Sequence, residues 1–179
     1  MLSIVKKALR NPILAFRVLM WRLQSLFYIR YIDDGGGRII IQGNNVKLII
    51  NKGKNAKFNL HGTLTIESFK GTGPVIISIN EGGVLDILGD FVLGDGVKIS
   101  ISKNAHLSLG GKKYESGSGI TGNSLIMVSK KIEIGYDLIC AWDVFITDSD
   151  WHHVEGQYHQ KDVRIGNHVW IANSTNVLK

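Results

Sequence analysis

Hydrophobic and polar residues alternate along most of this chain, in short runs separated by turns rich in glycine and asparagine. A period of two residues is that of a β-strand with one buried face, so each run predicts a short strand. The runs follow a glycine-rich turn at residues 33–37 and are Val46-Leu48-Ile50, Ala56-Phe58-Leu60, Val75-Ile77-Ile79, Leu85-Ile87, Val97-Ile99-Ile101 and Leu107-Leu109. The pattern predicts an all-β domain over residues 33–179.

Several of these runs belong to copies of one strand-turn-strand unit. Residues 46–62 read VKLIINKGKNAKFNLHG, residues 75–89 read VIISINEGGVLDILG and residues 97–111 read VKISISKNAHLSLGG. The second and third copies match without a gap, whereas the turn of the first is slightly longer. Such self-similarity predicts a solenoid, in which each unit buries its apolar face against its neighbours. A β-sandwich is the alternative that these units alone leave open.

The segment 1–32 follows a helical period instead. Asn11 is suited to cap a helix, because its side chain can accept a hydrogen bond from a free N–H group of the first turn. Pro12 is suited to begin the helix, because the N–H group of the first helical residue has no partner within the helix. We expect a helix from about Pro12 to Arg30, with a wide apolar surface. One polar stripe contains Lys6, Arg10, Arg17 and Gln24. Arginines interrupt the apolar run before it reaches the roughly 18 to 20 residues of a transmembrane helix, and no signal-peptide cleavage pattern follows.

Two interpretations of this amphipathic helix remain open. In the first, its basic groups bind anionic lipid head groups, which makes the protein peripheral at the inner face of the membrane. The aromatic residues at the lipid boundary are then Trp21, Phe27, Tyr28 and Tyr31. In the second, the helix covers the open end of the solenoid or packs between subunits.

The net charge of +6 is carried by this segment alone. Residues 1–32 contain six basic residues and no acidic residue, whereas residues 33–179 contain the other 15 basic residues and all 15 acidic residues. This distribution argues against a nucleic-acid partner. With 44% hydrophobic residues the chain is too apolar for disorder, and its single cysteine, Cys140, excludes a disulfide scaffold and fits a cytoplasmic protein.

A six-residue repeat dominates the last third of the chain. Each repeat starts with an apolar residue, continues with a small one and has an aliphatic or small residue four positions after its start. We expect the lead residue to point into a narrow triangular core and the small neighbour to allow a tight corner, so that three repeats close a coil of about 18 residues. The repeats begin at Ile134, Cys140 and Ile146, and again at Ile165, Ile171 and Val177.

These repeats resemble those of the hexapeptide-repeat acyltransferases, whose fold is a left-handed parallel β-helix. The strict repeats cover residues 134–147 and 165–177, and the looser units extend the resemblance back to about Arg38. The resemblance implies a left-handed parallel β-helix over residues 33–179, behind the helical segment 1–32. It also implies a homotrimer that binds acetyl-CoA in the groove between adjacent β-helices. Family members continue for one to three more coils, so we expect the domain to be truncated at its C-terminal end.

The repeat is interrupted once, between Ile146 and Ile165. Loops on rigid scaffolds commonly carry function, and this one holds three of the six histidines. Its titratable side chains include Asp148, Asp150, His152, His153, Glu155, His159 and Asp162. In relatives similar to maltose and galactoside acetyltransferases, a loop at this point carries the catalytic histidine after aspartates and an aromatic residue. That pattern resembles Asp148-Ser149-Asp150-Trp151-His152.

By this resemblance His152, or its neighbour His153, is the general base that deprotonates a sugar hydroxyl for direct attack on the thioester of acetyl-CoA. Imidazole suits the task because its ordinary pKa, about 6.5, leaves a neutral base available in the cytoplasm. Asp148 or Asp150 would fix the tautomer of the base and stabilise the imidazolium as it forms.

The resemblance assigns five further positions. Trp170 belongs to a Val-Trp-Ile stretch that lies on the outer face near the CoA groove in relatives. Ala172 and Asn173 are expected to contact acetyl-CoA beside it. Asn123 and Trp151 are expected on the side of the sugar substrate.

The function implied is a CoA-dependent O-acetyltransferase that acts on a sugar or a lipid-linked glycan in surface-polysaccharide biosynthesis. One alternative is a non-catalytic β-helix, a scaffold at the membrane. Another is a zinc enzyme similar to carbonic anhydrase, with ligands drawn from His152, His153, His159 and His168. Because adjacent histidines rarely bind one ion together, no metal site is predicted.

Overall fold

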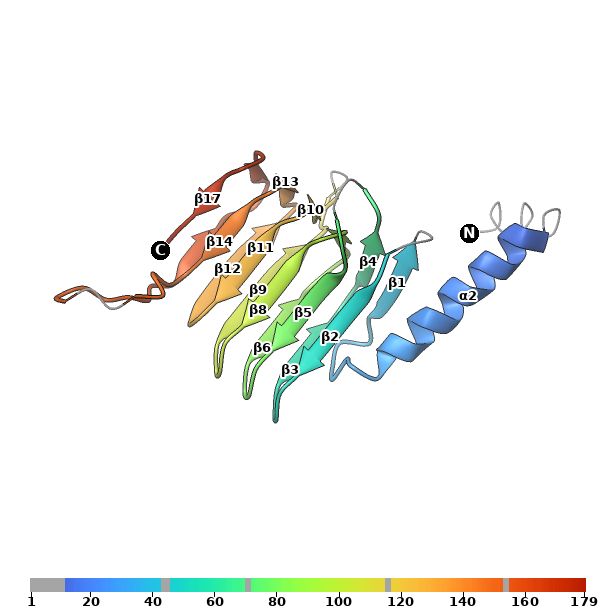
Figure 1. Ribbon diagram of the computed structural model, residues 1–179, viewed down its shortest axis with the longest axis horizontal. Coiled ribbons are helices and arrows are strands. Elements are labelled where there is room, and N and C mark those ends of the chain that lie inside the picture. Colours follow the sequence, from blue (N-terminus) through green and yellow to red (C-terminus); the bar gives the residue numbers. More distant parts are fainter. Residues whose placement is uncertain (1–11, 43–45, 70–71, 115–116, 153–154) are drawn as a thin grey trace.

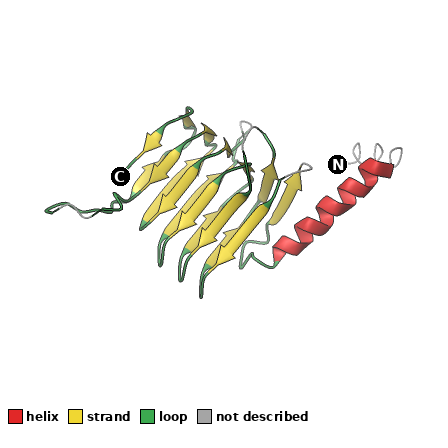
Figure 2. Cartoon of the chain, viewed as in Figure 1, coloured by secondary structure: helices red, strands yellow, loops and turns green. Residues whose placement is uncertain are grey.

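The computed structural model describes residues 12–42, 46–69, 72–114, 117–152 and 155–179. In these ranges the chain forms a β-solenoid of stacked coils, preceded by one α-helix at its N-terminal end (Figures 1 and 2). Each complete coil places one strand in each of three parallel sheets. The prediction of a solenoid is therefore confirmed, and the sandwich is excluded.

The three sheets are named here sheet 1, sheet 2 and sheet 3, in the order in which the chain enters them. Sheet 1 contains β1 (Arg38–Gln42), β4 (Thr63–Glu67), β7 (Phe91–Gly94), β10 (Gly119–Gly122), β13 (Ile139–Trp142) and β16 (Trp170–Ile171). Sheet 2 contains β2 (Leu48–Lys52), β5 (Val75–Ile79), β8 (Lys98–Ile101), β11 (Leu125–Val128), β14 (Phe145–Thr147) and β17 (Asn176–Val177). Sheet 3 contains β3 (Lys57–Leu60), β6 (Val84–Ile87), β9 (His106–Gly111), β12 (Lys131–Tyr136) and β15 (Val163–Ile165).

Inward-pointing side chains form columns along the solenoid. Phe58, Leu85, Leu107, Ile132 and Val163 occupy the same position of sheet 3 in five successive coils, and all five are buried. Within each strand, the residues directly before and after these positions are more exposed, which accounts for the alternation of apolar and polar residues in the sequence. Burial of such columns stabilises the stack, because a single coil has no other surface against which to bury them.

The six-residue repeats occupy the corners and strands that their pattern predicts. The leads Ile134, Cys140 and Ile146 are buried in β12, β13 and β14, and Leu138 and Val144, four positions after a lead, are buried as well. In the second run the lead Ile171 is buried, whereas Ile165 and Val177 are partly buried against the core. Burial raises the pKa of the Cys140 thiol to about 12, so this side chain is a core residue and not a nucleophile.

The coils are longer than three six-residue repeats. Gly119 in β10 pairs with Ile139 in β13, and Ile77 in β5 pairs with Ile99 in β8, so both coils exceed the predicted length. The coil that contains the segment between β14 and β15 is longer still, since Ile132 pairs with Val163. Turns at the corners account for the difference, because they add residues that belong to no strand.

The helix α2 (Pro12–Ile29) lies where the sequence predicts it. It runs beside β1 at the N-terminal end of the stack (Figure 1). The Tyr28 hydroxyl donates a hydrogen bond of 2.7 Å to the Leu48 carbonyl in β2. The expected cap residue and the first basic positions, Asn11, Lys6 and Arg10, lie outside the described residues. Among the described helices, none has the length and apolar character needed to cross a lipid bilayer.

Candidate functional site

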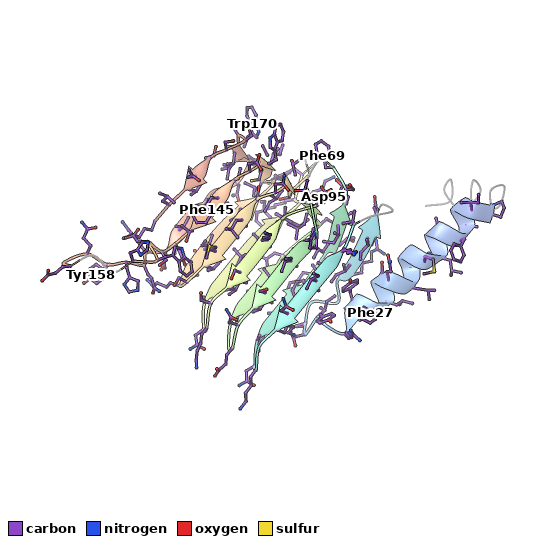
Figure 3. The ribbon with its side chains drawn as sticks, in the orientation of Figure 1. Phe27, Phe69, Asp95, Phe145, Tyr158 and Trp170 are labelled. Carbon is purple, nitrogen blue, oxygen red and sulfur yellow. The ribbon has the colours of Figure 1, made fainter. Side chains whose placement is uncertain are left out.

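The insertion between β14 and β15 folds back on itself as an extended loop at the corner between sheets 2 and 3. The Asp150 N–H donates to the His159 carbonyl at 2.9 Å, and the Lys161 N–H donates to the Asp148 carbonyl at 3.0 Å. Tyr158, near the tip, is 91% exposed and lies well outside the stack of coils (Figure 3). The loop is therefore ordered at its base and reaches away from its own solenoid.

Asp148 anchors the base of this loop. Its carboxylate is fully buried and accepts three backbone hydrogen bonds, from the N–H groups of Ser129, Lys130 and Lys131, at 2.6 to 2.8 Å. Ser129 and Lys130 form the turn between β11 and β12 in the coil before, and Lys131 begins β12. Both carboxylate oxygens are thus engaged by the neighbouring coil, and Asp148 holds the loop in place.

Trp151 continues the anchored part of the loop. Its indole N–H donates to the Thr147 hydroxyl at 3.0 Å, and its backbone N–H donates to the Ser149 hydroxyl at 3.2 Å. The backbone of Trp151 has a φ of 60°, a left-handed conformation that costs a non-glycine residue free energy. This turn directs the chain outward at the next residue.

That next residue is His152, and its side chain is exposed to solvent. Among the described residues, its imidazole has no hydrogen-bond or ion-pair partner. His153, the alternative base, lies outside the described residues.

Asp150, the second candidate to orient the base, is paired elsewhere. Its carboxylate lies 2.6 Å from the Nζ atom of Lys179, which also donates a hydrogen bond to the Tyr158 carbonyl. Lys179 follows β17 in sheet 2 and so joins the last residues of the chain to the loop.

A second candidate feature is a groove of about 290 Å³ on sheet 1. Small and apolar residues line it, because Val92, Gly119 and Ile139 follow one another in register on successive strands. Glu67, the last residue of β4, and Phe69, which follows the strand, line the groove at the corner between sheets 1 and 2. Sequence analysis missed this feature, and the only signal for it is the run of glycine and serine at residues 117–119.

The predicted donor-binding residues extend the same row of sheet 1. Trp170 pairs with Ile139 and is 74% exposed on the outer face. Ala172 and Asn173 follow it and are exposed at the corner that leads to β17. An apolar strip therefore runs from the groove to the last strand of the sheet.

Asn123, a predicted sugar contact, lies at the corner between β10 and β11. Its side-chain carbonyl accepts a hydrogen bond of 2.8 Å from the Thr72 N–H, and its φ is 46°. Asparagine tolerates this left-handed conformation better than most residues, so the contact with Thr72 and the turn explain its presence.

The corner between sheets 3 and 1 contains a buried carboxylate. Oδ1 of Asp137 accepts hydrogen bonds from the N–H groups of Lys113 and Tyr114, at 2.8 and 3.2 Å, whereas Oδ2 has no hydrogen-bond partner in the described residues. Nδ1 of His168 lies 3.6 Å from Oδ2. Burial opposes ionisation of Asp137, but the two backbone donors and nearby His168 outweigh it and lower its pKa.

The loop and the groove do not meet within one chain. The loop leaves the corner between sheets 2 and 3, whereas the groove and Trp170 are on sheet 1, and Figure 3 shows Tyr158 far from Phe69 and Trp170. The predicted catalytic residues Asp148, Asp150 and His152 are therefore on a different surface from the predicted donor-binding residues. Groups of three or more potential metal ligands are absent from the described part of the chain.

Comparisons with known proteins add one relationship. No family profile matches the sequence, and no solved structure matches it significantly. The chain is similar to the polysialic acid O-acetyltransferase of Neisseria meningitidis, with 29% identity over 109 residues, which cover 58% of this chain and 49% of the relative. The chain thus spans about half the length of the curated relative that it matches. Together with the β-solenoid, this similarity supports a relationship to hexapeptide-repeat acyltransferases.

Proposed function

We propose that this protein is an O-acyltransferase that moves an acetyl group from acetyl-CoA to a sugar hydroxyl during the assembly of a surface glycan. The observation that carries the proposal is the position of His152. Its imidazole is exposed and without a described partner, on a loop whose base is fixed by the buried Asp148. The similarity to a polysialic acid O-acetyltransferase supports the acetyl group and the glycan.

In the proposed reaction, a ring nitrogen of His152 accepts the proton of the acceptor hydroxyl while the hydroxyl oxygen bonds to the thioester carbonyl carbon. The carbon–sulfur bond then breaks, and the imidazolium returns the proton to the sulfur. Asp148 acts as a positioning residue, because its oxygens already accept three N–H groups. His153 is the alternative base.

The groove and strip on sheet 1 fit the donor. Small residues such as Gly119 let an extended chain approach the backbone, and Val92 and Ile139 offer apolar contact. Trp170 and Ala172 lie in the continuation of this strip. We further propose that the loop of one copy reaches the strip of the next copy in a homotrimer, since the two surfaces are separate within one chain.

The test is acetyl transfer to a panel of sialic acid and hexose oligosaccharides, measured as thiol release from acetyl-CoA. His152→Ala should lower kcat by about 100-fold to 10,000-fold, the usual contribution of a general base. His153→Ala, made in parallel, should leave more activity. His61→Ala is the matched control, because His61 is an exposed histidine in another coil. Full activity of the His152→Ala/His153→Ala double variant would show that the mechanism is wrong.

A further inference from the structure

The outward face of α2 is apolar and exposed. At 100° per residue, six of its large exposed residues fall within about 120° of the helix circumference, whereas Ile13 and Ile29, also exposed, lie outside this arc. The six are Phe16, Leu19, Met20, Leu23, Leu26 and Phe27, and their exposed fractions range from 39% to 63%. A helix in a water-soluble domain normally packs such a face against its own core, so an exposed apolar face indicates a binding surface.

The opposite face of the helix is already occupied. Val18, Ser25 and Tyr28 are partly buried, and Tyr28 packs against the core and bonds to Leu48 in β2. The chain after the helix is also fixed, because Lys52 forms an ion pair with Asp33 and donates to the Tyr31 carbonyl at 3.1 Å. The solenoid therefore holds the helix with its apolar face outward.

Charge identifies the partner. Residues 1–32 contain six basic residues and no acidic residue, and Arg17 and Arg22 are at helix positions on either side of the apolar face. A second copy of the same helix would bring like charges together, which opposes self-association. An anionic bilayer offers acyl chains to the apolar face and negatively charged head groups to the arginines.

We propose that α2 docks the protein on an anionic phospholipid bilayer, with the apolar face inserted at the head-group boundary and the arginines at lipid phosphates. The helix lies across the N-terminal end of the stack (Figure 1). The loop of residues 148–162 follows β14 in the fifth coil, so with strands about 4.8 Å apart it stands about 20 Å from the first coil. A bound protein would then act on a glycan that extends from the membrane.

The experiment is sedimentation of the full chain with vesicles of phosphatidylcholine alone or mixed with phosphatidylglycerol. The wild-type protein should bind the mixed vesicles about tenfold or more better, and rising sodium chloride should weaken that binding. Phe16→Asp/Leu23→Asp should reduce binding by about tenfold or more, because it puts carboxylates in the inserted face. Arg17→Gln/Arg22→Gln, which keeps the apolar face, should mainly reduce the preference for phosphatidylglycerol.

Tyr158→Asp is the matched control, since it makes a similar change at an exposed aromatic residue far from the helix. It should bind vesicles as the wild type does. Equal binding by the wild type and Phe16→Asp/Leu23→Asp, with both proteins folded by circular dichroism, would overturn the proposal. So would a lack of wild-type binding to mixed vesicles. Light scattering that shows the double variant dissociating a dimer would assign the face to a second copy instead.

Discussion

Single buried carboxylates hold successive coils together at two corners of this solenoid. Asp148 and Asp137 are both buried, and each accepts backbone N–H groups from the coil before its own. A buried ionised group is costly unless several donors satisfy it, so each carboxylate fixes the turn that supplies them. Asp148 thereby positions His152, and Asp137 positions the turn after β9.

Replacement of Asp148 by asparagine should destabilise the protein. The amide presents an NH₂ group where an oxygen now accepts N–H groups, so at least one buried donor loses its partner. We expect the free energy of unfolding in urea to fall by about 2 to 3 kcal/mol. Asp143→Asn, at an exposed turn, should change it by less than about 0.5 kcal/mol. Normal stability with lost acetyl transfer would instead place Asp148 in the chemistry.

Asp137 should make the protein sensitive to acid. Its pKa is lowered below the ordinary 3.8, so the folded state binds this proton less readily than the unfolded state. The stability that results is present above pH 3.8 and is lost as the pH falls through the lower folded pKa. Thermal midpoints of the wild type should therefore approach those of Asp137→Asn as the pH falls from about 6 toward about 3.

Other carboxylates with lowered pKa values titrate equally in both proteins and cancel from this comparison. They are Asp33, Glu133 and Asp162. A constant difference between the two proteins across the whole pH range would show that the ionisation of Asp137 contributes nothing.

Glycines at one corner set how closely the coils approach. The corner after sheet 3 has a glycine in successive coils, and a Cβ on Gly62 or Gly135 would lie within 3.0 Å of the backbone of the next coil. Gly166 occupies the same repeat position as Gly135, but nothing in the described part of the chain lies within 4 Å of its Cβ position. The small second residue of the repeat is therefore explained by the coil that stacks on it.

This difference predicts unequal effects of one substitution. Gly135→Ala should lower the free energy of unfolding by about 1 to 3 kcal/mol, because the methyl group meets the Gly166 carbonyl at 2.8 Å. Gly166→Ala should be neutral, or stabilising by up to about 1 kcal/mol, because alanine restricts the unfolded chain. Urea denaturation curves of the two variants measure both changes in the free energy of unfolding. Equal losses would mean that contact with the next coil does not set the cost of the added methyl group.

The elements differ in how well sequence predicts them. The helix and most strands of sheets 2 and 3 follow from periodicity, because β2 and β3 and their counterparts repeat as one unit with short turns. The strands β1, β4, β7 and β10 of sheet 1, and β11 of sheet 2, are missing from the predicted runs and repeats. Segments 68–74 and 112–118 flank β4 and β10 and disturb the period, whereas β13 and β16 are predicted only through the repeat leads Cys140 and Ile171. Strand periodicity needs several residues, so short strands beside long corners escape it.

At the scale of the whole molecule, the site depends on contacts that no local pattern encodes. The insertion with His152 stands out in the sequence because it breaks a repeat. The groove does not, because Val92, Gly119 and Ile139 come together only through the register of three coils. The hydrogen bonds from residues 129–131 to Asp148 cannot be predicted from the sequence either, because the donors belong to another coil and nothing in the local sequence distinguishes Asp148 from an exposed aspartate.

The separation of the loop from sheet 1 gives the last prediction. If each site combines His152 of one copy with Trp170 of the next, His152→Ala and Trp170→Ala damage different halves of a site. Each variant alone should be nearly inactive in acetyl transfer. When the two are co-expressed and assort at random, about a quarter of the sites contain both intact residues, so about a quarter of the wild-type activity should return. His152→Ala co-expressed with His152→Ala/Trp170→Ala supplies no intact base and should recover nothing. Mass spectrometry of differently tagged chains verifies that mixed oligomers form, and mixed oligomers without recovered activity would place both residues in one chain's site.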